Sequence, residues 1–175
     1  MPTLAIMVTA TTYGTWLRGD RRGSIQDGRL LPPLPWLAAN DRGRMKHEPF
    51  LFPEDRLLDV GQMIGDSLIE RKGVTILALH VARWHMHFVI AATQHDLADV
   101  VKCAKDSARY GLKPGRPIWT ADYDKRFCFD EPSVRNRIAY VERHNLAMGW
   151  SARPWNFITE YVCHPSLSPR SMTGG

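Results

Sequence analysis

The sequence predicts an α+β fold, a sandwich in which helices pack on one mainly antiparallel sheet. Stretches with strand alternation are interspersed with stretches of helical periodicity, which is typical of this class. Residues 74–92 are apolar and long enough for two consecutive strands, which indicates a hairpin and hence antiparallel pairing. The length of 175 residues and the 44% hydrophobic content suit a single domain, which we place at residues 1–160.

The first expected elements are a strand over 4–10 and a long basic connection at about 18–52. Roughly 35 residues without clear periodicity are too many for a plain connection, so we expect a disordered or functional loop. Aromatic residues alternate with arginines here, a combination that stacks on bases and contacts phosphates. Trp36 and Phe52 are instead expected to fix the loop to the core. The candidate nucleic-acid contacts of this region are Arg18, Arg21, Arg22, Tyr13 and Trp16.

Three helices are expected after this loop, at 53–71, 96–111 and 130–148. Each begins with acidic residues or proline, which favour the first turn of a helix. Apolar residues then recur at helical spacing, so that each helix has one face for the core.

The remaining strands lie between these helices. The two strands of 74–92 are expected to join near Ala82-Arg83, and short extended segments are expected at 117–119 and 126–129. Residues 161–175, with several prolines and a Gly-Gly end, are expected to form a flexible tail.

Charge and cysteine content narrow the class of protein. The chain has 23 Lys+Arg against 18 Asp+Glu, a net charge of +5 that favours a polyanionic partner. Arginine outnumbers lysine, and its planar fork suits phosphates and base edges. Three cysteines without C-x-x-C spacing argue against a disulfide framework and favour the cytoplasm. The N-terminus resembles neither a signal peptide nor a membrane span.

The triplet His85-Met86-His87 is the most informative motif. Because side chains alternate along a strand, His85 and His87 project from one face. Trp84, Met86 and Phe88 are expected to project from the other face into the core. Two neighbouring imidazoles form a pair of metal ligands. The alternative is that both histidines are partly buried and only hydrogen-bond the backbone.

A second constellation lies on the third predicted helix. Tyr140 and His144 are four positions apart and share a helix face, and Arg137 joins them three positions earlier. A phenol can act as a nucleophile, and His144 could complete a three-histidine metal site with the triplet. Taken alone, a tyrosine with an apolar body and a solvated hydroxyl is common on helices.

These two motifs resemble those of a known family. The triplet is an H-hydrophobic-H (HUH) motif, and Tyr140-Val141-Glu142-Arg143-His144-Asn145 is similar to the tyrosine helix of single-tyrosine HUH transposases. The similarity is greatest to the REP-associated tyrosine transposases and related insertion-sequence-like proteins. The stretches Leu146 to Trp150, Arg153 to Trp155 and T-T-Y-G-T-W-L-R-G-D-R-R-G-S also resemble them. The resemblance covers roughly residues 1–158 in element order, and its specific motifs about twenty residues.

The chain departs from the family pattern at two positions. His144 stands where the family usually has Asn or Gln, four residues after the tyrosine, and Asn145 stands where it often has Pro. Histidine is still a competent ligand, so metal binding is expected to persist with a changed metal preference.

The resemblance implies a ferredoxin-like core and cleavage of single-stranded or hairpin DNA, such as a REP hairpin. Tyr140 would attack phosphorus, giving a 5′-phosphotyrosine that can be rejoined because a phenolate is a good leaving group. A divalent cation on His85, His87 and His144 would stabilise the scissile phosphate, with Arg137 beside it. Mg²⁺ or Mn²⁺ is expected in function, whereas three imidazoles also favour Ni²⁺ or Zn²⁺, which can occupy the site in a crystal.

Two other functions stay open. One is a domesticated DNA-binding protein that recognises hairpins without cutting them, against which the presence of Tyr140 and both triplet histidines argues. The other is a two-histidine RNA phosphoesterase, for which the only second motif is His164-Pro165-Ser166. A monomer and a homodimer are both compatible with the sequence. Structural roles are expected for four further histidines, His47, His80, His95 and His164.

Overall fold

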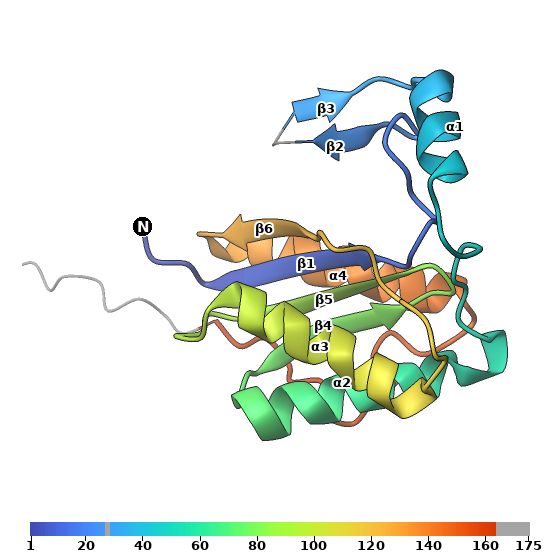
Figure 1. Cartoon of the computed structure of the whole chain (residues 1–175). Coiled ribbons are helices and arrows are strands. Elements are labelled where there is room, and N and C mark those ends of the chain that lie inside the picture. The colour runs from blue at the N-terminus through green and yellow to red at the C-terminus, as the bar shows by residue number, and fades with distance from the viewer. Residues whose placement is uncertain (27–28, 164–175) are drawn as a thin grey trace, which may run out of the picture.

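The computed structural model describes residues 1–26 and 29–163 (Figure 1). Its central sheet has the strand order β4-β5-β1-β6, and every neighbouring pair is antiparallel. This arrangement, with a helix after β1 and another after β5, is a split βαβ core, which confirms the predicted α+β, ferredoxin-like fold. Its elements are β1 (Ala5–Thr11), α2 (Leu57–Lys72), β4 (Ile76–Val81), β5 (His85–Ala91), α3 (Leu97–Leu112), β6 (Asp124–Cys128) and α4 (Glu131–Ala147).

The sheet has a helical layer on each face. Helices α2 and α3 cover one face, and α4 covers the other (Figure 1). Alternation along β1 explains the division: Val8 packs with α2 and α3, whereas Met7 packs with α4. On β5, Phe88 lies on the first side and Val89 on the second. The face covered by α4 is therefore also the face from which odd-numbered residues of β5 project.

Local chemistry sets the helix ends close to where the sequence predicts them. The carboxylates of Asp96 and Asp130 accept hydrogen bonds from backbone N–H groups in the first turns of α3 and α4. A short 3₁₀ turn, η1 (Glu54–Arg56), precedes α2. Gly73 ends α2 in the left-handed conformation, with φ of 59°, which glycine adopts without steric cost.

The connection after β1 contains elements that periodicity does not predict. It holds a hairpin of β2 (Ser24–Gln26) and β3 (Arg29–Leu31), and the helix α1 (Pro35–Gly43). No residue of α1 is buried. The expectation that Trp36 fixes this segment to the core is wrong, since its side chain is 68% exposed, whereas Phe52 is fully buried as expected. The segment lies beyond the C-terminal end of β1 (Figure 1).

Within the described part of the chain, no helix combines the length and apolarity that crossing a bilayer requires. Most of the expected flexible tail, residues 164–175, lies outside the described residues. The motif His164-Pro165-Ser166 lies there as well.

Candidate active site

The triplet histidines lie side by side on the α4 face of β5. Both side chains are buried, each 6% exposed, and their ring centroids are 4.5 Å apart. The antiparallel register pairs His85 with Thr11 and His87 with Thr9 of β1. The hydroxyl of Thr9 lies 2.7 Å from Nδ1 of His87, which fixes that ring. Met86 projects to the opposite face and is fully buried in the core, as alternation predicts.

Helix α4 brings the tyrosine and the third predicted histidine to this pair. Val134 and Val141 are fully buried and pack the helix onto the sheet, so the neighbouring helix face borders β5. The rings of Tyr140 and His144 are 4.7 Å apart, and both lie near His87, at 5.5 and 5.1 Å. The four residues that the sequence singled out for chemistry thus meet in space.

A fifth residue, His80 on β4, also belongs to the cluster. Among the described residues, His80, His85 and His144 form a group whose potential ligand nitrogens all lie within 4.8 Å of one another. The sequence suggested His87 as the third member of this group, whereas the structure places His80 there. The register pairs His80 directly with His87 across the hairpin. The turn that sets this register is Arg83-Trp84, whereas the predicted join near Ala82-Arg83 would have paired His80 with His85.

Burial keeps the imidazoles neutral. Loss of hydration lowers the pKa of His80 to about 4 and that of His85 to about 3. The same cause lowers the pKa of His87 to about 2 and also lowers the pKa of His144. A neutral imidazole offers one lone pair, which is the form that binds a metal.

His85 shows that this cluster fits a cation. Both of its ring nitrogens are buried and have no hydrogen-bond partner. Buried polar atoms are rarely left unpaired, because each costs about 1–3 kcal/mol. A divalent metal on the lone pair of His85 would satisfy one of these two nitrogens, and the close nitrogens of His80 and His144 supply further ligands of the same type.

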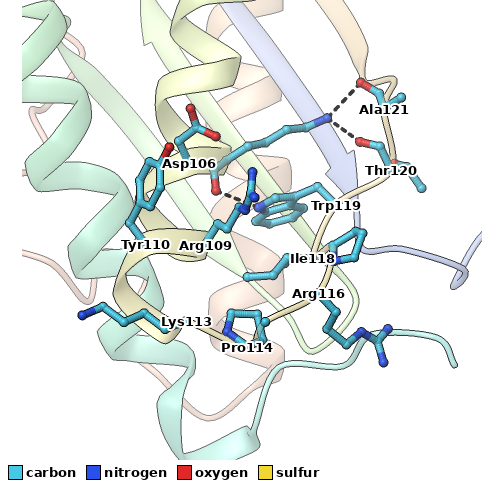
Figure 2. A pocket seen from close by; sticks show the side chains of 13 residues that line it. Asp106, Arg109, Tyr110, Lys113, Pro114, Arg116, Ile118, Trp119, Thr120 and Ala121 are labelled. Atoms are coloured by element: carbon cyan, nitrogen blue, oxygen red, sulfur yellow. Dashed lines mark hydrogen bonds between the residues drawn. The ribbon is translucent and has the colours of Figure 1, made fainter. Parts of the chain in front are cut away.

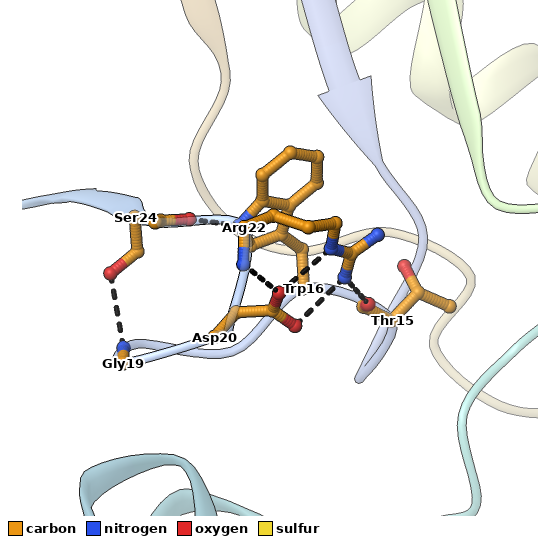
Figure 3. A network of polar contacts seen from close by, with 7 residues as sticks. Thr15, Trp16, Gly19, Asp20, Arg22 and Ser24 are labelled. Carbon is orange, nitrogen blue, oxygen red and sulfur yellow. Dashed lines mark hydrogen bonds and ion pairs between the residues drawn. The ribbon is translucent and has the colours of Figure 1, made fainter. Parts of the chain in front are cut away.

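An arginine between two tryptophans closes one side of the site. The guanidinium carbon of Arg22 lies 4.1 Å from the ring centroid of Trp16 and 5.0 Å from that of Trp84. Arg22 also donates hydrogen bonds to both carboxylate oxygens of Asp20 and to the carbonyl of Thr15 (Figure 3). The expectation that Trp84 is a core residue is wrong. It precedes β5 rather than alternating within it, and its ring lies against that of His85, with 4.0 Å between centroids and 56° between planes.

The other residues predicted to contact DNA lie away from the histidine cluster. Arg18 forms an ion pair with Asp41, with 2.6 Å between Nη2 and Oδ1. Arg21 is exposed on the turn before β2, and Arg137 is exposed on α4. The hydroxyl of Tyr13 accepts a hydrogen bond from the backbone N–H of Lys46 and so anchors the segment that follows α1.

Three of the four clustered histidines line one cavity of about 410 Å³ together with Tyr140, Trp16 and Trp84, whereas His80 does not line it. A larger cavity of about 730 Å³ lies between α3 and the chain that follows it (Figure 2). It has a basic rim, but the ammonium group of Lys105 already donates hydrogen bonds to the carbonyls of Thr120, Ala121 and Asp122. No histidine lines it, whereas the smaller cavity brings together three histidines and Tyr140 and is therefore the candidate active site. That cavity is lined by Thr9, Thr11, Trp16, Arg22, Trp84, His85, His87, Tyr140 and His144.

The fold is similar to that of a solved tyrosine transposase. The chain superposes on a REP-associated tyrosine transposase bound to a REP hairpin, with a TM-score of 0.52 and 12% identity, covering 90% of this chain and 76% of that one. A candidate transposase from Deinococcus radiodurans R1 is also similar, with a TM-score of 0.41, 17% identity and coverage of 82% and 92%. No protein-family model and no curated protein sequence matches the chain.

Proposed function

We propose that the protein is a metal-dependent endonuclease and strand transferase of the transposase type that acts on single-stranded DNA. It recognises hairpin DNA and cuts it through a covalent 5′-phosphotyrosine. The unit that does this is one domain, residues 1–160, in which the segment of about 18–52 contributes to DNA recognition. Such a substrate agrees with the cytoplasmic location expected from the cysteine usage.

One observation supports this proposal above the others. A tyrosine hydroxyl and four neutral imidazoles share one neighbourhood, in a fold shared with a transposase that was solved with a DNA hairpin. Tyr140 is 36% exposed, so a strand can reach its hydroxyl, whereas His85 and His87 are buried behind it. A surface tyrosine without a function would not require this buried and incompletely hydrogen-bonded cluster beside it.

The chemistry assigned to the chain is a transesterification. The oxygen of Tyr140 forms a bond to phosphorus as the bond from phosphorus to the 3′ oxygen breaks. The phenol loses its proton and the leaving 3′ oxygen gains one. A cation such as Mn²⁺ or Mg²⁺, held by imidazoles of His80, His85, His87 and His144, would stabilise charge on the scissile phosphate.

The wall made by Trp16, Arg22 and Trp84 gives the cavity a surface for nucleic acid. Indole rings stack on bases of any sequence, and a guanidinium pairs with phosphate. Asp20 holds Arg22 in place, so little side-chain freedom is lost when DNA binds. Arg137, on the same helix as Tyr140, can contact the strand outside the cavity.

A labelled hairpin library tests the function. The full-length protein is incubated with single-stranded hairpin DNA and Mn²⁺, and the products are separated on a denaturing gel. A covalent protein–DNA band is expected, and it carries a label from the 3′ end of the DNA but none from the 5′ end. A band with the opposite polarity would contradict the 5′-phosphotyrosine. Hairpin binding without any adduct would favour the non-cleaving alternative.

A further inference from the structure

A further cavity, which we call the flanking cavity, adjoins the candidate active site. It has a volume of about 730 Å³ and lies between the chain that follows β1 and the chain at the end of α1. Arg22 and Trp84 line both this cavity and the one that contains Tyr140, so they form the wall between the two. The other residues of its lining are Gly14, Thr15, Arg42, Met45, Lys46, His47, Glu48, Pro49 and Leu51.

Local contacts hold the flanking cavity in shape. The backbone N–H of Phe50 donates to the carbonyl of Tyr13, and the hydroxyl of Tyr13 accepts from the N–H of Lys46. These bonds join the two chain segments that line the cavity. Gly14 lies between them with φ of 74°, and a Cβ atom there would overlap the side chain of Met45. The cavity therefore needs little ordering when a ligand binds.

The flanking cavity carries cations that the protein leaves available. Among the described residues, the exposed side chains of Arg42 and Lys46 have neither a hydrogen bond nor an ion pair. Arg22 uses Nε and Nη2 for hydrogen bonds within the protein, which leaves the two N–H groups of Nη1 (Figure 3). Of the residues that line the cavity, only Glu48 is acidic. Cations beside the indole of Trp84 suit one nucleotide, with its phosphate on the cations and its base against the ring.

Tyr140 and the flanking cavity lie at opposite ends of the active site. Four rings form a row, with 5.5 Å between the centroids of Tyr140 and His87, 4.5 Å from His87 to His85 and 4.0 Å from His85 to Trp84. The last three follow the chain toward the start of β5, so the row runs in one direction. In an in-line displacement at phosphorus, the attacking and leaving oxygens lie on opposite sides. With Tyr140 as the nucleophile, the 3′ oxygen departs toward Trp84.

We propose that the flanking cavity retains the strand that cleavage releases, by binding the nucleotide that carries the freed 3′ hydroxyl. The 5′ phosphate of this nucleotide pairs with Arg42 and Lys46, and its base lies against Trp84. The other strand needs no such site, because the phosphotyrosine holds it covalently. This inference rests on the proposed function and names the part of the DNA that the cavity binds.

Retention serves the reverse reaction. The 3′ oxygen forms a bond to phosphorus as the bond from phosphorus to the oxygen of Tyr140 breaks. The hydroxyl loses its proton and the phenolate gains one. A strand that stays bound keeps its hydroxyl beside the phosphotyrosine, so rejoining is favoured over loss of the strand.

The test follows the two strands separately in the double variant Arg42→Gln/Lys46→Gln. The full-length protein cleaves saturating hairpin DNA in Mn²⁺. A 5′ label follows the released strand on a native gel, and a 3′ label follows the adduct on a denaturing gel. The released strand should dissociate at least about tenfold faster than from the wild type, because two charged contacts are lost. The adduct should accumulate to a higher level, since rejoining requires the retained strand.

The matched control is Arg29→Gln/Arg44→Gln, which removes the same charge from exposed positions of the same segment, outside the lining of the flanking cavity. Its release rate should equal that of the wild type. A release rate for Arg42→Gln/Lys46→Gln less than about tenfold above that of the control overturns the proposal. So does an adduct level that falls instead of rising.

A second measurement uses the wild-type protein and needs no cleavage. In protein labelled with ¹³C-methyl methionine, short oligo(dT) or oligo(dA) with a free 3′ hydroxyl should shift the methyl resonance of Met45. Met63, on α2, serves as the control and should not shift. A Met45 resonance that does not move at millimolar oligonucleotide overturns the proposal.

These results separate the inference from the activity. A wild type that forms no adduct contradicts the proposed function, and the Met45 resonance then still decides whether the cavity binds a nucleotide. An adduct that forms while the Met45 resonance stays fixed contradicts the retention site and leaves the proposed function standing.

Discussion

Among the described residues that line the cavity, Tyr140 alone carries a phenol, and its side chain is accessible from solvent. Tyr140→Phe removes only an oxygen from a side chain that is 36% exposed. Folding and hairpin binding should stay within about twofold of the wild type, since surface changes usually cost under 0.5 kcal/mol. The covalent adduct should disappear because the two other hydroxyls that line the cavity, those of Thr9 and Thr11, are engaged in hydrogen bonds with His87 and Thr120. A denaturing gel with end-labelled hairpin measures this.

Tyr110→Phe serves as the matched control. Tyr110 is also an exposed helical tyrosine, 62% exposed on α3, and lines the other cavity. Its variant should form the adduct at the normal yield. If Tyr140→Phe kept a normal yield, the nucleophile would have to be sought elsewhere, beginning with Tyr123.

His144 is expected to set the metal preference of the site. His144→Asn replaces an imidazole nitrogen with an amide oxygen, a harder ligand. Cleavage should persist, with Mg²⁺ and Mn²⁺ gaining relative to later metals such as Ni²⁺. His85→Ala should instead eliminate cleavage, because His85 has no other buried role for its two ring nitrogens. Cleavage rates across a series of metals decide between these outcomes, and an unchanged metal order in His144→Asn would contradict the first.

The sequence predicted single residues where a local pattern carries the information. Alternation along one strand gives His85 and His87, and helical spacing gives Tyr140 with His144. His80 requires the register of a hairpin, which depends on the conformation of the turn rather than on any pattern within a strand. For this reason its side chain was expected to be structural only.

At the scale of elements, the segment between β1 and α2 carries the recognition hypothesis. Replacing Arg18, Arg21 and Arg22 together with alanine should weaken hairpin binding. It should also flatten the salt dependence, by up to about one counterion per lost phosphate contact. The ion pairs with Asp41 and Asp20 show that Arg18 and Arg22 are held in place. Fluorescence anisotropy at several salt concentrations measures both effects.

Arg71→Ala is the control for this experiment, because Arg71 is an exposed arginine on α2, on the opposite side of the sheet from α4. At saturating DNA the triple variant should still form the adduct. Equal affinity and salt slope in the triple variant and the wild type would exclude this segment as the DNA-binding element.

Helix α2 depends on a glycine for its packing. A Cβ atom at Gly61 would lie 2.0 Å from Cζ2 of Trp155, whose buried indole donates to the carbonyl of Leu58. Alanine usually stabilises a helix interior by about 0.5–1 kcal/mol relative to glycine. Here overpacking should dominate, and Gly61→Ala should lower the free energy of unfolding by about 1–3 kcal/mol.

The comparison variant is Gly43→Ala at the end of α1, where no atom lies within 4 Å of the added Cβ. It should be neutral or slightly stabilising. Urea unfolding of both variants measures the difference, and a Gly61→Ala protein at least as stable as the wild type would show that Trp155 can move aside.

The elements of the core were predictable because each buries one face at a regular period. The β2–β3 hairpin and α1 were not, since their strands have three residues each and α1 buries none. Without a buried face, no apolar periodicity marks such elements in the sequence. Their position beyond the end of β1 follows from tertiary packing. One such contact is that of Trp16, which lies between β1 and β2, with Trp84 before β5.

For the whole molecule, metal binding should be coupled to folding. The histidines that would bind the metal ion come from β4, β5 and α4. The unfolded chain therefore lacks the site. At a concentration of one hundred times Kd, a metal adds about 2.7 kcal/mol to the stability. Mn²⁺ should therefore raise Tm by about 5–10 °C for a domain of this size, and EDTA should reverse the rise.

Differential scanning calorimetry measures this shift, and His85→Ala supplies the control in which Mn²⁺ should leave Tm unchanged. EDTA should also eliminate cleavage by the native protein. Cleavage that persists at full rate in EDTA would contradict the metal mechanism, even if Mn²⁺ raised Tm.

Asn145 has a consequence for how strands could be exchanged. Its three hydrogen bonds tie the C-terminal part of α4 to β4 and to the chain at Ala152, and each costs about 1 kcal/mol or more to break when buried. Tyr140 lies on the same helix. It therefore cannot move to a second position while the hydrogen bonds of Asn145 stay intact. During a cycle of cleavage and rejoining, Tyr140 would keep its position in the protein. The DNA ends would therefore have to exchange places at the site.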